Sequence, residues 1–253
     1  PQRKPDWLKV RAPGGENYSE IKALLKKLNL HTVCEEARCP NMAECWGSGT
    51  ATMMLMGDTC TRACKFCHVK TGNPKGLLDE SEPEKVADAV CQMGLSYVVL
   101  TSVDRDDLPD GGADHFSRTV EAIKKANSKI FVEVLIPDFL GDQKALSRIA
   151  QSGVDVVAHN LETVERLTPV VRDRRCNYRV SLEVLHYLKR EFPTLYTKSS
   201  LMVGIGETGD EVAGTMDDLR SVEVDVLTIG QYLRPSEWNV PVPEYIRPEI
   251  CQN

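Results

Sequence analysis

The chain has 253 residues, 42% of them hydrophobic, which suits one large α/β domain or a domain with a smaller appendage. Its net charge of −6 argues against the broad basic surface of a general nucleic-acid-binding protein. No apolar run is long enough to cross a bilayer, and the first residues hold neither an apolar signal core nor a presequence rich in Ser and Arg. Since Pro1 is not a natural initiation site, we expect a processed or trimmed N-terminus. We predict an enzyme that is not secreted and has no membrane or nucleic-acid partner.

Cysteine is the unusual component of the sequence. Nine cysteines are present, and six of them fall between Cys34 and Cys67. A secreted disulfide scaffold is typically a short, loop-rich chain with an even number of cysteines. Here the number is odd, and the rest of the chain has the periodicity of an ordinary α/β protein. The cysteines therefore predict metal binding rather than disulfides.

The first fifty residues do not follow a β/α rhythm. Residues 17–30 have the pattern of an amphipathic helix, residues 28–33 are a weak strand candidate, and the first three cysteines follow. We interpret residues 1–50 as an N-terminal extension that carries a cysteine motif.

From residue 51 onward, strand and helix patterns alternate. Apolar runs predict six strands, at residues 51–57, 97–103, 129–136, 154–159, 198–205 and 224–229. Between them, spacings of three and four residues predict five helices, at residues 84–93, 114–126, 142–151, 178–190 and 211–221. This alternation predicts a parallel sheet with helices outside it.

Six β/α units are too few for a complete eight-stranded barrel. We therefore expect an α/β fold that is a partial (β/α)6 barrel over residues 51–235, with its chemistry at the carboxyl ends of the strands. Polar residues follow four of the apolar runs at that rim, at residues 101–104, 160–162, 204–207 and Gln231. Each might cap a strand alone, but four on one rim favour a binding site.

Cys60, Cys64 and Cys67 form a C-x₃-C-x₂-C motif in the loop after the first barrel strand. Three thiolates on one short loop can ligate three irons of a cubane cluster, and soft sulfur ligands favour iron–sulfur clusters or zinc. A closed zinc site needs four protein ligands, and His68 is a less favourable fourth ligand because it directly follows Cys67. Three ligands leave one iron open to a small molecule.

Cys34, Cys39 and Cys45 form a second motif, C-x₄-C-x₅-C. Taken alone, this spacing also suits a zinc site with a distant fourth ligand.

The two motifs together closely resemble the lipoyl synthases of the radical S-adenosylmethionine superfamily. Further segments carry the same resemblance along nearly the whole chain, at residues 30–41, 57–62, 100–107, 158–164, 201–207 and 230–236. The resemblance implies a radical sulfurtransferase that inserts two sulfur atoms, at C6 and C8, into an octanoyl chain on a lysine of a carrier protein. It also implies two [4Fe–4S] clusters and S-adenosylmethionine, with the auxiliary cluster at the Cys34 motif as sulfur donor.

The resemblance further implies which residues contact S-adenosylmethionine. Phe66 would pack near the adenine, although ordinary core packing explains it equally well. Ser102 and Asp104 would bind the methionine amino group, and Asn160 and Glu162 the ribose hydroxyls. Glycines at 204 and 206 would let the backbone approach the adenine closely. Singly, each of these residues can also be read as a strand cap.

Partners and compartment follow from the same resemblance. We expect octanoylated lipoyl carrier domains, namely the E2 subunits of 2-oxoacid dehydrogenases and the glycine cleavage H protein, together with a reducing electron donor. A basic run at residues 172–179 is either a solvated loop or a docking patch for an acidic carrier domain. We expect a monomer, in the mitochondrial matrix of a eukaryote or the cytoplasm of a bacterium.

One family motif is missing from the sequence. Lipoyl synthases carry an Arg-Ser-Ser-Tyr motif whose serine is the fourth ligand of the auxiliary cluster, and residues 236–253 contain no such motif. We expect this tail to be truncated. Two alternatives stay open: another radical sulfur-insertion or methylthiolation enzyme, and a non-catalytic zinc-binding relative.

Overall fold

The computed structural model describes residues 5–8, 16–36, 42–47 and 50–252. Its N-terminal part contains the elements η1 (Asp6–Leu8), α1 (Glu16–Leu28), β1 (His31–Thr32), α2 (Val33–Glu36) and α3 (Met42–Gly47). The helix expected at residues 17–30 is therefore present as α1. The weak strand candidate is present as β1, which pairs antiparallel with the strand that follows it.

Six parallel strands form the body of the molecule. They are β2 (Thr50–Leu55), β5 (Tyr97–Ser102), β6 (Phe131–Leu135), β7 (Val156–Ala158), β8 (Tyr196–Val203) and β9 (Val226–Gln231). Each pairs with its neighbour in chain order, so the sheet runs β1-β2-β5-β6-β7-β8-β9. Two short strands, β3 (Thr59–Cys60) and β4 (Lys70–Thr71), form a separate parallel pair.

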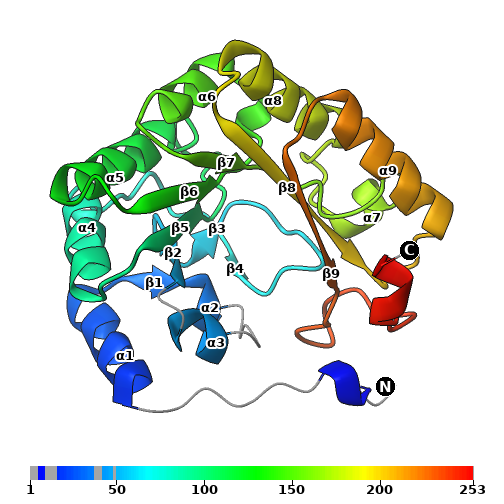
Figure 1. Cartoon of the computed structure of the whole chain (residues 1–253), viewed down its shortest axis with the longest axis horizontal. Coiled ribbons are helices and arrows are strands. Elements are labelled where there is room, and N and C mark those ends of the chain that lie inside the picture. The colour runs from blue at the N-terminus through cyan, green and yellow to red at the C-terminus, as the bar shows by residue number, and fades with distance from the viewer. Residues whose placement is uncertain (1–4, 9–15, 37–41, 48–49, 253) are drawn as a thin grey trace.

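Helices cover the outer face of this curved sheet (Figure 1). The long ones are α4 (Glu82–Gln92), α5 (Ala113–Ala126), α6 (Gln143–Ala150), α8 (Tyr178–Glu191) and α9 (Gly209–Ser221). The short pieces are η2 (Phe139–Gly141), η3 (Glu165–Leu167), α7 (Thr168–Val171) and η4 (Pro248–Gln252). Within the described residues β1 and β9 are the two edges of the sheet, so the barrel is open between them. The predicted partial barrel of six β/α units is confirmed.

Local sequence explains where the helices begin. Thr208 caps α9 in a capping box, in which its hydroxyl accepts the backbone N–H of Glu211 and its own N–H donates to the Glu211 carboxylate. Asn177 caps α8 by accepting the N–H groups of the next turn. Helix α4 begins two residues before the predicted start because Pro83 suits the first turn of a helix.

The N-terminal part shares the core of the barrel. Ile21 and Leu25 of α1 lie in the same buried cluster as Met53 of β2 and Leu100 of β5. The described residues of the predicted extension therefore pack on the barrel rather than around a core of their own. Across the described ranges, no helix has both the length and the apolar character needed to cross a bilayer.

Phe116 tests how much this core contributes to stability. Its ring, on α5, is completely buried. We expect Phe116→Ala to lower the free energy of unfolding by about 3–5 kcal/mol, because it removes a large apolar side chain and leaves a cavity. Leu77→Ala, at a side chain 77% exposed, is the matched control and should change it by less than about 0.5 kcal/mol. Urea unfolding of both variants measures this, and equal losses would contradict it.

Candidate functional site

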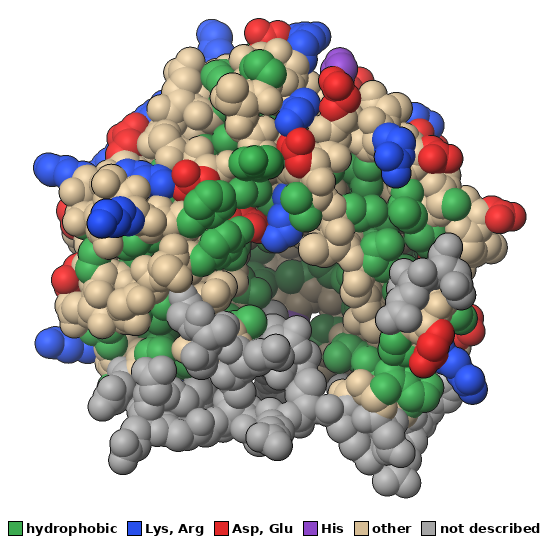
Figure 2. All heavy atoms as spheres, viewed as in Figure 1, with side chains coloured by type: hydrophobic (Ala, Val, Ile, Leu, Met, Phe, Trp, Pro, Cys, Tyr) green, Lys and Arg blue, Asp and Glu red, His purple; other side chains and the backbone are tan. Residues whose placement is uncertain are grey.

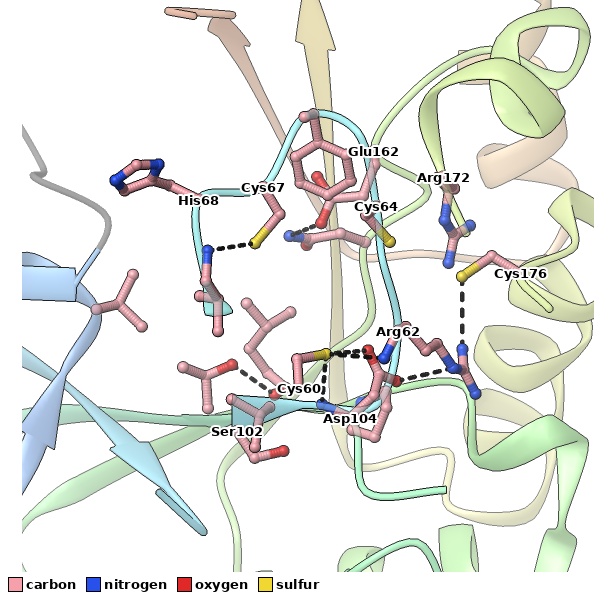
Figure 3. Close-up of a pocket in the computed structure, with 18 of the residues that line it drawn as sticks. Cys60, Arg62, Cys64, Cys67, His68, Ser102, Asp104, Glu162, Arg172 and Cys176 are labelled. Carbon is pink, nitrogen blue, oxygen red and sulfur yellow. Dashed lines mark hydrogen bonds and ion pairs between the residues drawn. The ribbon is translucent and has the colours of Figure 1, made fainter. Parts of the chain in front are cut away.

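A cavity of about 440 Å³ opens at the carboxyl ends of the strands and holds the thiols of Cys60, Cys64 and Cys67. Figure 2 shows the molecule hollowed in the middle of one face, between hydrophobic side chains. Cys60 ends β3, and Cys64 and Cys67 follow in the loop that leads to β4; we call residues 60–67 the cluster loop. All three cysteines are half-buried and line the cavity (Figure 3).

Each of the three sulfurs accepts a backbone N–H. Cys60 Sγ lies 3.3 Å from the Asp104 nitrogen, and Cys64 Sγ lies 3.2 Å from the Asp173 nitrogen. Cys67 Sγ lies 3.5 Å from the nitrogen of Val69. Such N–H···S hydrogen bonds stabilise the thiolate form that binds metal, and they tune the potential of an iron–sulfur cluster.

Without metal, the surroundings oppose ionisation of these thiols. Burial, with the nearby Asp104 carboxylate, raises the pKa of Cys60 to about 12. The pKa of Cys64 is raised chiefly because its thiol donates to Cys176, and burial raises that of Cys67. Ligand binding must therefore displace the thiol protons, as it does in other thiolate metal sites.

The donor set fits an iron–sulfur cluster. Within the described part of the chain, no three His, Cys, Asp or Glu side chains converge on one metal-ion position. A cubane cluster does not need them to converge, because each thiolate ligates a different iron. His68 also lines the cavity, next to Cys67.

Arg62 fixes the cluster loop to the ends of two strands. Its side chain is 2% exposed and forms paired hydrogen bonds with Asp106, at 3.0 and 2.8 Å, and with Asp138, at 2.9 and 2.8 Å. A third carboxylate, that of Asp104, lies 3.3 Å from its Nε. Two of these aspartates follow β5 and the third follows β6, so one guanidinium connects three segments.

The network shifts the pKa values of its members in different directions. Burial disfavours the charge on Arg62, but its hydrogen bonds to Asp106 and Asp138 outweigh burial and raise its pKa. Burial is likewise outweighed at Asp138, where the Arg62 guanidinium lowers the carboxyl pKa. At Asp104 burial prevails and the pKa rises. Sequence reasoning missed both Arg62 and Asp138, because no local pattern marks an ion pair between residues 76 positions apart.

Five of the residues predicted to bind S-adenosylmethionine lie together. Phe66, Ser102, Asp104, Asn160 and Glu162 all line the cavity that holds the three thiols. The Ser102 hydroxyl oxygen is buried and has no hydrogen-bond partner among the described residues, so it is available to a ligand.

Glu162 is held rigidly at this rim. Its backbone has φ of 67°, an unusual left-handed conformation for a non-glycine residue, and it bonds β8 through Ser200 and Met202. Asn160 donates to its carboxylate at 3.1 Å. Burial raises the pKa of Glu162, against the opposing charge of Arg172.

The two predicted glycines lie elsewhere. Neither is among the described residues that line the cavity. A Cβ on Gly204 would stand 2.3 Å from the Gln231 amide and 2.5 Å from the Glu244 carbonyl, so its close approach is to the chain itself. Gly206 faces Pro243. Both glycines lie against other parts of the chain because β9 and the following segment pack over the end of β8. The strand patterns of the sequence did not predict this packing.

The motif of Cys34, Cys39 and Cys45 is described only in part. Cys34 is buried in α2 and Cys45 is half-buried in α3, whereas Cys39 lies outside the described residues. Val33, the neighbour of Cys34, lines the cavity. The segment that carries this motif therefore borders the same cavity as the cluster loop.

The C-terminal segment also contacts the cluster loop. The Asn239 side-chain amide donates to the carbonyls of Lys65 and Cys67, at 3.1 and 2.8 Å. The Val240 nitrogen donates to the Lys65 carbonyl at 3.0 Å. Residues 236–240 thus complete one side of the site.

Most of the basic run at residues 172–179 is already paired. Arg172 is buried and donates to Ser181 at 2.9 Å. Arg175 pairs with Asp173 and Asp106, and Arg179 pairs with Glu165. Within the same run Cys176 lines the cavity, and Arg62 donates to its sulfur at 3.4 Å.

Known proteins resemble the chain at the level of both sequence and fold. The model of the radical SAM superfamily matches residues 54–219, and that of the N-terminal domain of lipoyl synthase matches residues 1–39. The chain is 57% identical to lipoyl synthase of Anaeromyxobacter sp. (strain Fw109-5) over 98% of its own length and 84% of the relative's. It is 58% identical to lipoyl synthase of Myxococcus xanthus, over 97% and 82%.

A eukaryotic lipoyl synthase and two solved structures are also similar to the chain. Mitochondrial lipoyl synthase of Drosophila ananassae is 57% identical, over 98% of this chain and 67% of that protein. The crystal structure of methylornithine synthase matches with a TM-score of 0.59 at 13% identity, over 89% of this chain and 67% of that one. A second, of the [FeFe]-hydrogenase maturase HydG, has the same TM-score at 12% identity, over 86% and 55%.

Replacing Arg62 tests the ion network. We expect Arg62→Met to lower the free energy of unfolding of the cluster-free protein by about 3–5 kcal/mol, because it leaves the buried Asp138 carboxylate unpaired. Arg118→Met, which removes an exposed pair with Glu80, should cost no more than about 1 kcal/mol. Urea unfolding near neutral pH measures both.

The same comparison has a predicted pH dependence. The Asp138 pKa is lowered in the folded protein, so its stabilisation is complete above the unfolded pKa of about 3.9 and is lost as the pH falls through the folded value. The difference between wild type and Arg62→Met should therefore be constant above about pH 5 and shrink below about pH 4. A difference that grows in acid would refute this account.

Proposed function

Because the chain belongs to the lipoyl synthase family of radical S-adenosylmethionine enzymes, we propose that its cavity joins radical generation to sulfur insertion into a protein-bound octanoyl chain. The enzyme is a radical SAM sulfur-inserting enzyme, and its family implies a [4Fe–4S] cluster and S-adenosylmethionine. The observation that carries the proposal is one cavity lined by three thiols and five polar or aromatic residues of the expected cofactor site. The high identity to lipoyl synthases favours this activity over methylthiolation or a zinc-binding role.

We assign the cluster to Cys60, Cys64 and Cys67. When bound, the cluster and S-adenosylmethionine supply the radical chemistry. The N–H groups aimed at the three sulfurs stabilise the thiolates that hold the cluster. Arg62 holds the loop against the strand ends and so fixes the position of the three ligands.

We assign S-adenosylmethionine to the strand-end residues of the same cavity. The unpartnered Ser102 hydroxyl and the Asp104 carboxylate would receive the methionine amino group. The Asn160–Glu162 pair would accept and donate hydrogen bonds at the ribose hydroxyls. Phe66 would pack on the adenine.

We assign the auxiliary cluster and the acyl substrate by proximity to this cavity. Cys34, Cys39 and Cys45 would hold the second cluster, beside Val33 at the cavity wall. Apolar residues of the wall, such as Leu135, Ile136 and Met202, would surround the octanoyl chain and keep water from the reacting carbon atoms.

Partners and compartment complete the proposal. The substrate proteins are octanoylated lipoyl carrier domains, and a one-electron reductant serves the cluster. Of the basic run, the exposed Arg174 is the remaining candidate for a carrier contact, since Arg172, Arg175 and Arg179 bond residues of the chain itself. The compartment is the mitochondrial matrix of a eukaryotic cell or the bacterial cytoplasm.

The division of labour between the motifs is the main test. The chain with Cys60, Cys64 and Cys67 changed to Ala should hold about half the wild-type iron and lose cleavage of S-adenosylmethionine. The chain with Cys34, Cys39 and Cys45 changed to Ala should also hold about half the iron, yet still form 5′-deoxyadenosine. It should transfer no sulfur to an octanoyl-lysyl peptide, because C–S bond formation needs sulfide beside the carbon radical.

Iron and sulfide analysis after anaerobic reconstitution, with product mass spectrometry, measures these outcomes. Full iron in either triple variant would show that the corresponding motif holds no cluster. Sulfur transfer by the second variant would overturn the assignment of the auxiliary cluster as sulfur donor.

Glu162 tests the cofactor site. Glu162→Ala should weaken S-adenosylmethionine binding by about 1–3 kcal/mol and leave the iron content unchanged, because it removes hydrogen bonds to the ligand only. The matched control is Glu165→Ala, at an exposed carboxylate paired with Arg179, which should bind normally. Titration calorimetry on the cluster-loaded proteins measures the dissociation constant of S-adenosylmethionine for both variants. An unchanged constant for Glu162→Ala would show that Glu162 has only a structural role.

A further inference from the structure

A fourth thiol lies in the cavity besides those of the cluster loop. Cys176 belongs to neither cysteine motif, yet it lines the same cavity as Cys60, Cys64 and Cys67. Figure 3 shows its side chain directed toward the cluster loop from the segment that precedes α8. Arg62 donates to its sulfur at 3.4 Å, from the same guanidinium that holds the loop.

Cys176 lies beside one of the three ligand cysteines, Cys64, across the residue Asp173 that bonds both. Both residues line the cavity, and Figure 3 shows their side chains directed toward each other. Asp173 holds both residues: its nitrogen donates to Cys64 Sγ at 3.2 Å, and its carbonyl accepts the Cys176 N–H at 2.9 Å. The Asp173 carboxylate accepts the Ala63 N–H at 2.8 Å, which ties the two segments together once more. The two sulfurs are therefore kept together by the fold.

Both thiols are accessible. Each is half-buried and faces the open cavity, whereas Cys34 is buried in the core. Cys91 is exposed on α4 but does not line the cavity. A small molecule that enters the cavity thus meets a preformed pair of thiols. Because the fold already holds the two residues near each other, little conformational freedom is lost when they are joined.

We propose that Cys64 and Cys176 form a disulfide in the cluster-free protein by exchange with a low-molecular-weight disulfide. In the first step the Cys176 thiolate attacks one sulfur of the small disulfide, forms a mixed disulfide and releases one small thiolate. In the second step the Cys64 thiolate attacks the Cys176 sulfur and releases the second small thiolate. Two protein thiols are oxidised, one small disulfide is reduced, and the two thiol protons go to the two leaving thiolates.

The disulfide would control cluster binding. It removes Cys64 from the cluster loop and leaves only Cys60 and Cys67 as ligands there, so the oxidised chain cannot accept a cluster until it is reduced. In the loaded protein iron holds Cys64, which protects the pair from exchange. This consequence rests on the proposed cluster role of Cys64, whereas formation of the disulfide does not.

Peptide mapping tests the bond itself. The full-length cluster-free protein is treated anaerobically with glutathione disulfide, alkylated, digested and analysed by mass spectrometry. We expect a linked peptide pair containing Cys64 and Cys176 as the main oxidised product, which a phosphine reductant reverses. Cluster-loaded protein should give at least about tenfold less of it. A main product that joins Cys64 to Cys60 or Cys67, or a stable glutathione adduct at Cys176, overturns the proposal.

Iron uptake tests the consequence. In chains whose Cys34, Cys39 and Cys45 are changed to Ala, only the cluster loop takes up iron. There the same treatment should lower the initial rate of iron incorporation without added thiol by about tenfold when Cys176 is present and by less than about twofold in Cys176→Ser. Cys91→Ser, the matched control outside the cavity, should behave like wild type. Circular dichroism verifies that both variants fold. If the linked peptide forms but iron uptake is unchanged, the disulfide assignment stands and the cluster role of Cys64 fails. If wild type forms no Cys64–Cys176 peptide, the disulfide assignment fails.

Discussion

The ion network around Arg62 is the constraint on which the site depends. A loop that carries three candidate ligands has to be held rigidly, and most of its hydrogen bonds run to residues outside the loop. Arg62 supplies the anchor from within the loop, and the aspartates that follow β5 and β6 receive it. Three carboxylates offset the free energy of burying this cation, and two of them, Asp106 and Asp138, each accept two hydrogen bonds from it. The strand ends therefore position the ligands, and the sheet is a rigid base for chemistry that takes place in a loop.

The electrostatics of the cavity suit the exchange of protons for metal. Carboxylates and burial keep the three thiols protonated in the absence of metal, while backbone N–H groups already point at the sulfurs. Burial and the nearby carboxylates disfavour a thiolate without metal. A thiolate bound to iron would be stable in the same place, because the positive metal compensates its charge and the backbone N–H groups still donate to the sulfur. Glu162 has a left-handed backbone that two hydrogen bonds hold against β8, and it lines the cavity.

Strands and long helices were predictable from the sequence because their periods are local. The six barrel strands and five outer helices lie within a few residues of the predicted ranges. Five predicted cofactor residues reach one cavity, because carboxyl ends of parallel strands meet at one edge. What could not be predicted depends on contacts between distant residues. Arg62 and Cys176 are joined across 114 positions, and Gly204 lies close to the Glu244 carbonyl, 40 positions later in the chain. Short helices such as α2 and α7 have too few residues for a periodic signal.

The contacts of the cluster loop also bear on the order in which the protein matures. Residues 60–67 bond partners 44, 76, 110 and 172 positions away, and the last of these, Asn239, enters after the final strand. Contacts of such separation form late, since each requires closure of a long loop. The ligand geometry therefore exists only once all six strands have assembled, and a partly synthesised or partly folded chain offers loose thiols instead of a site. If the cluster binds as proposed, its loading would report completed folding, and because binding favours only the folded state, iron supply and the lifetime of the protein would be linked.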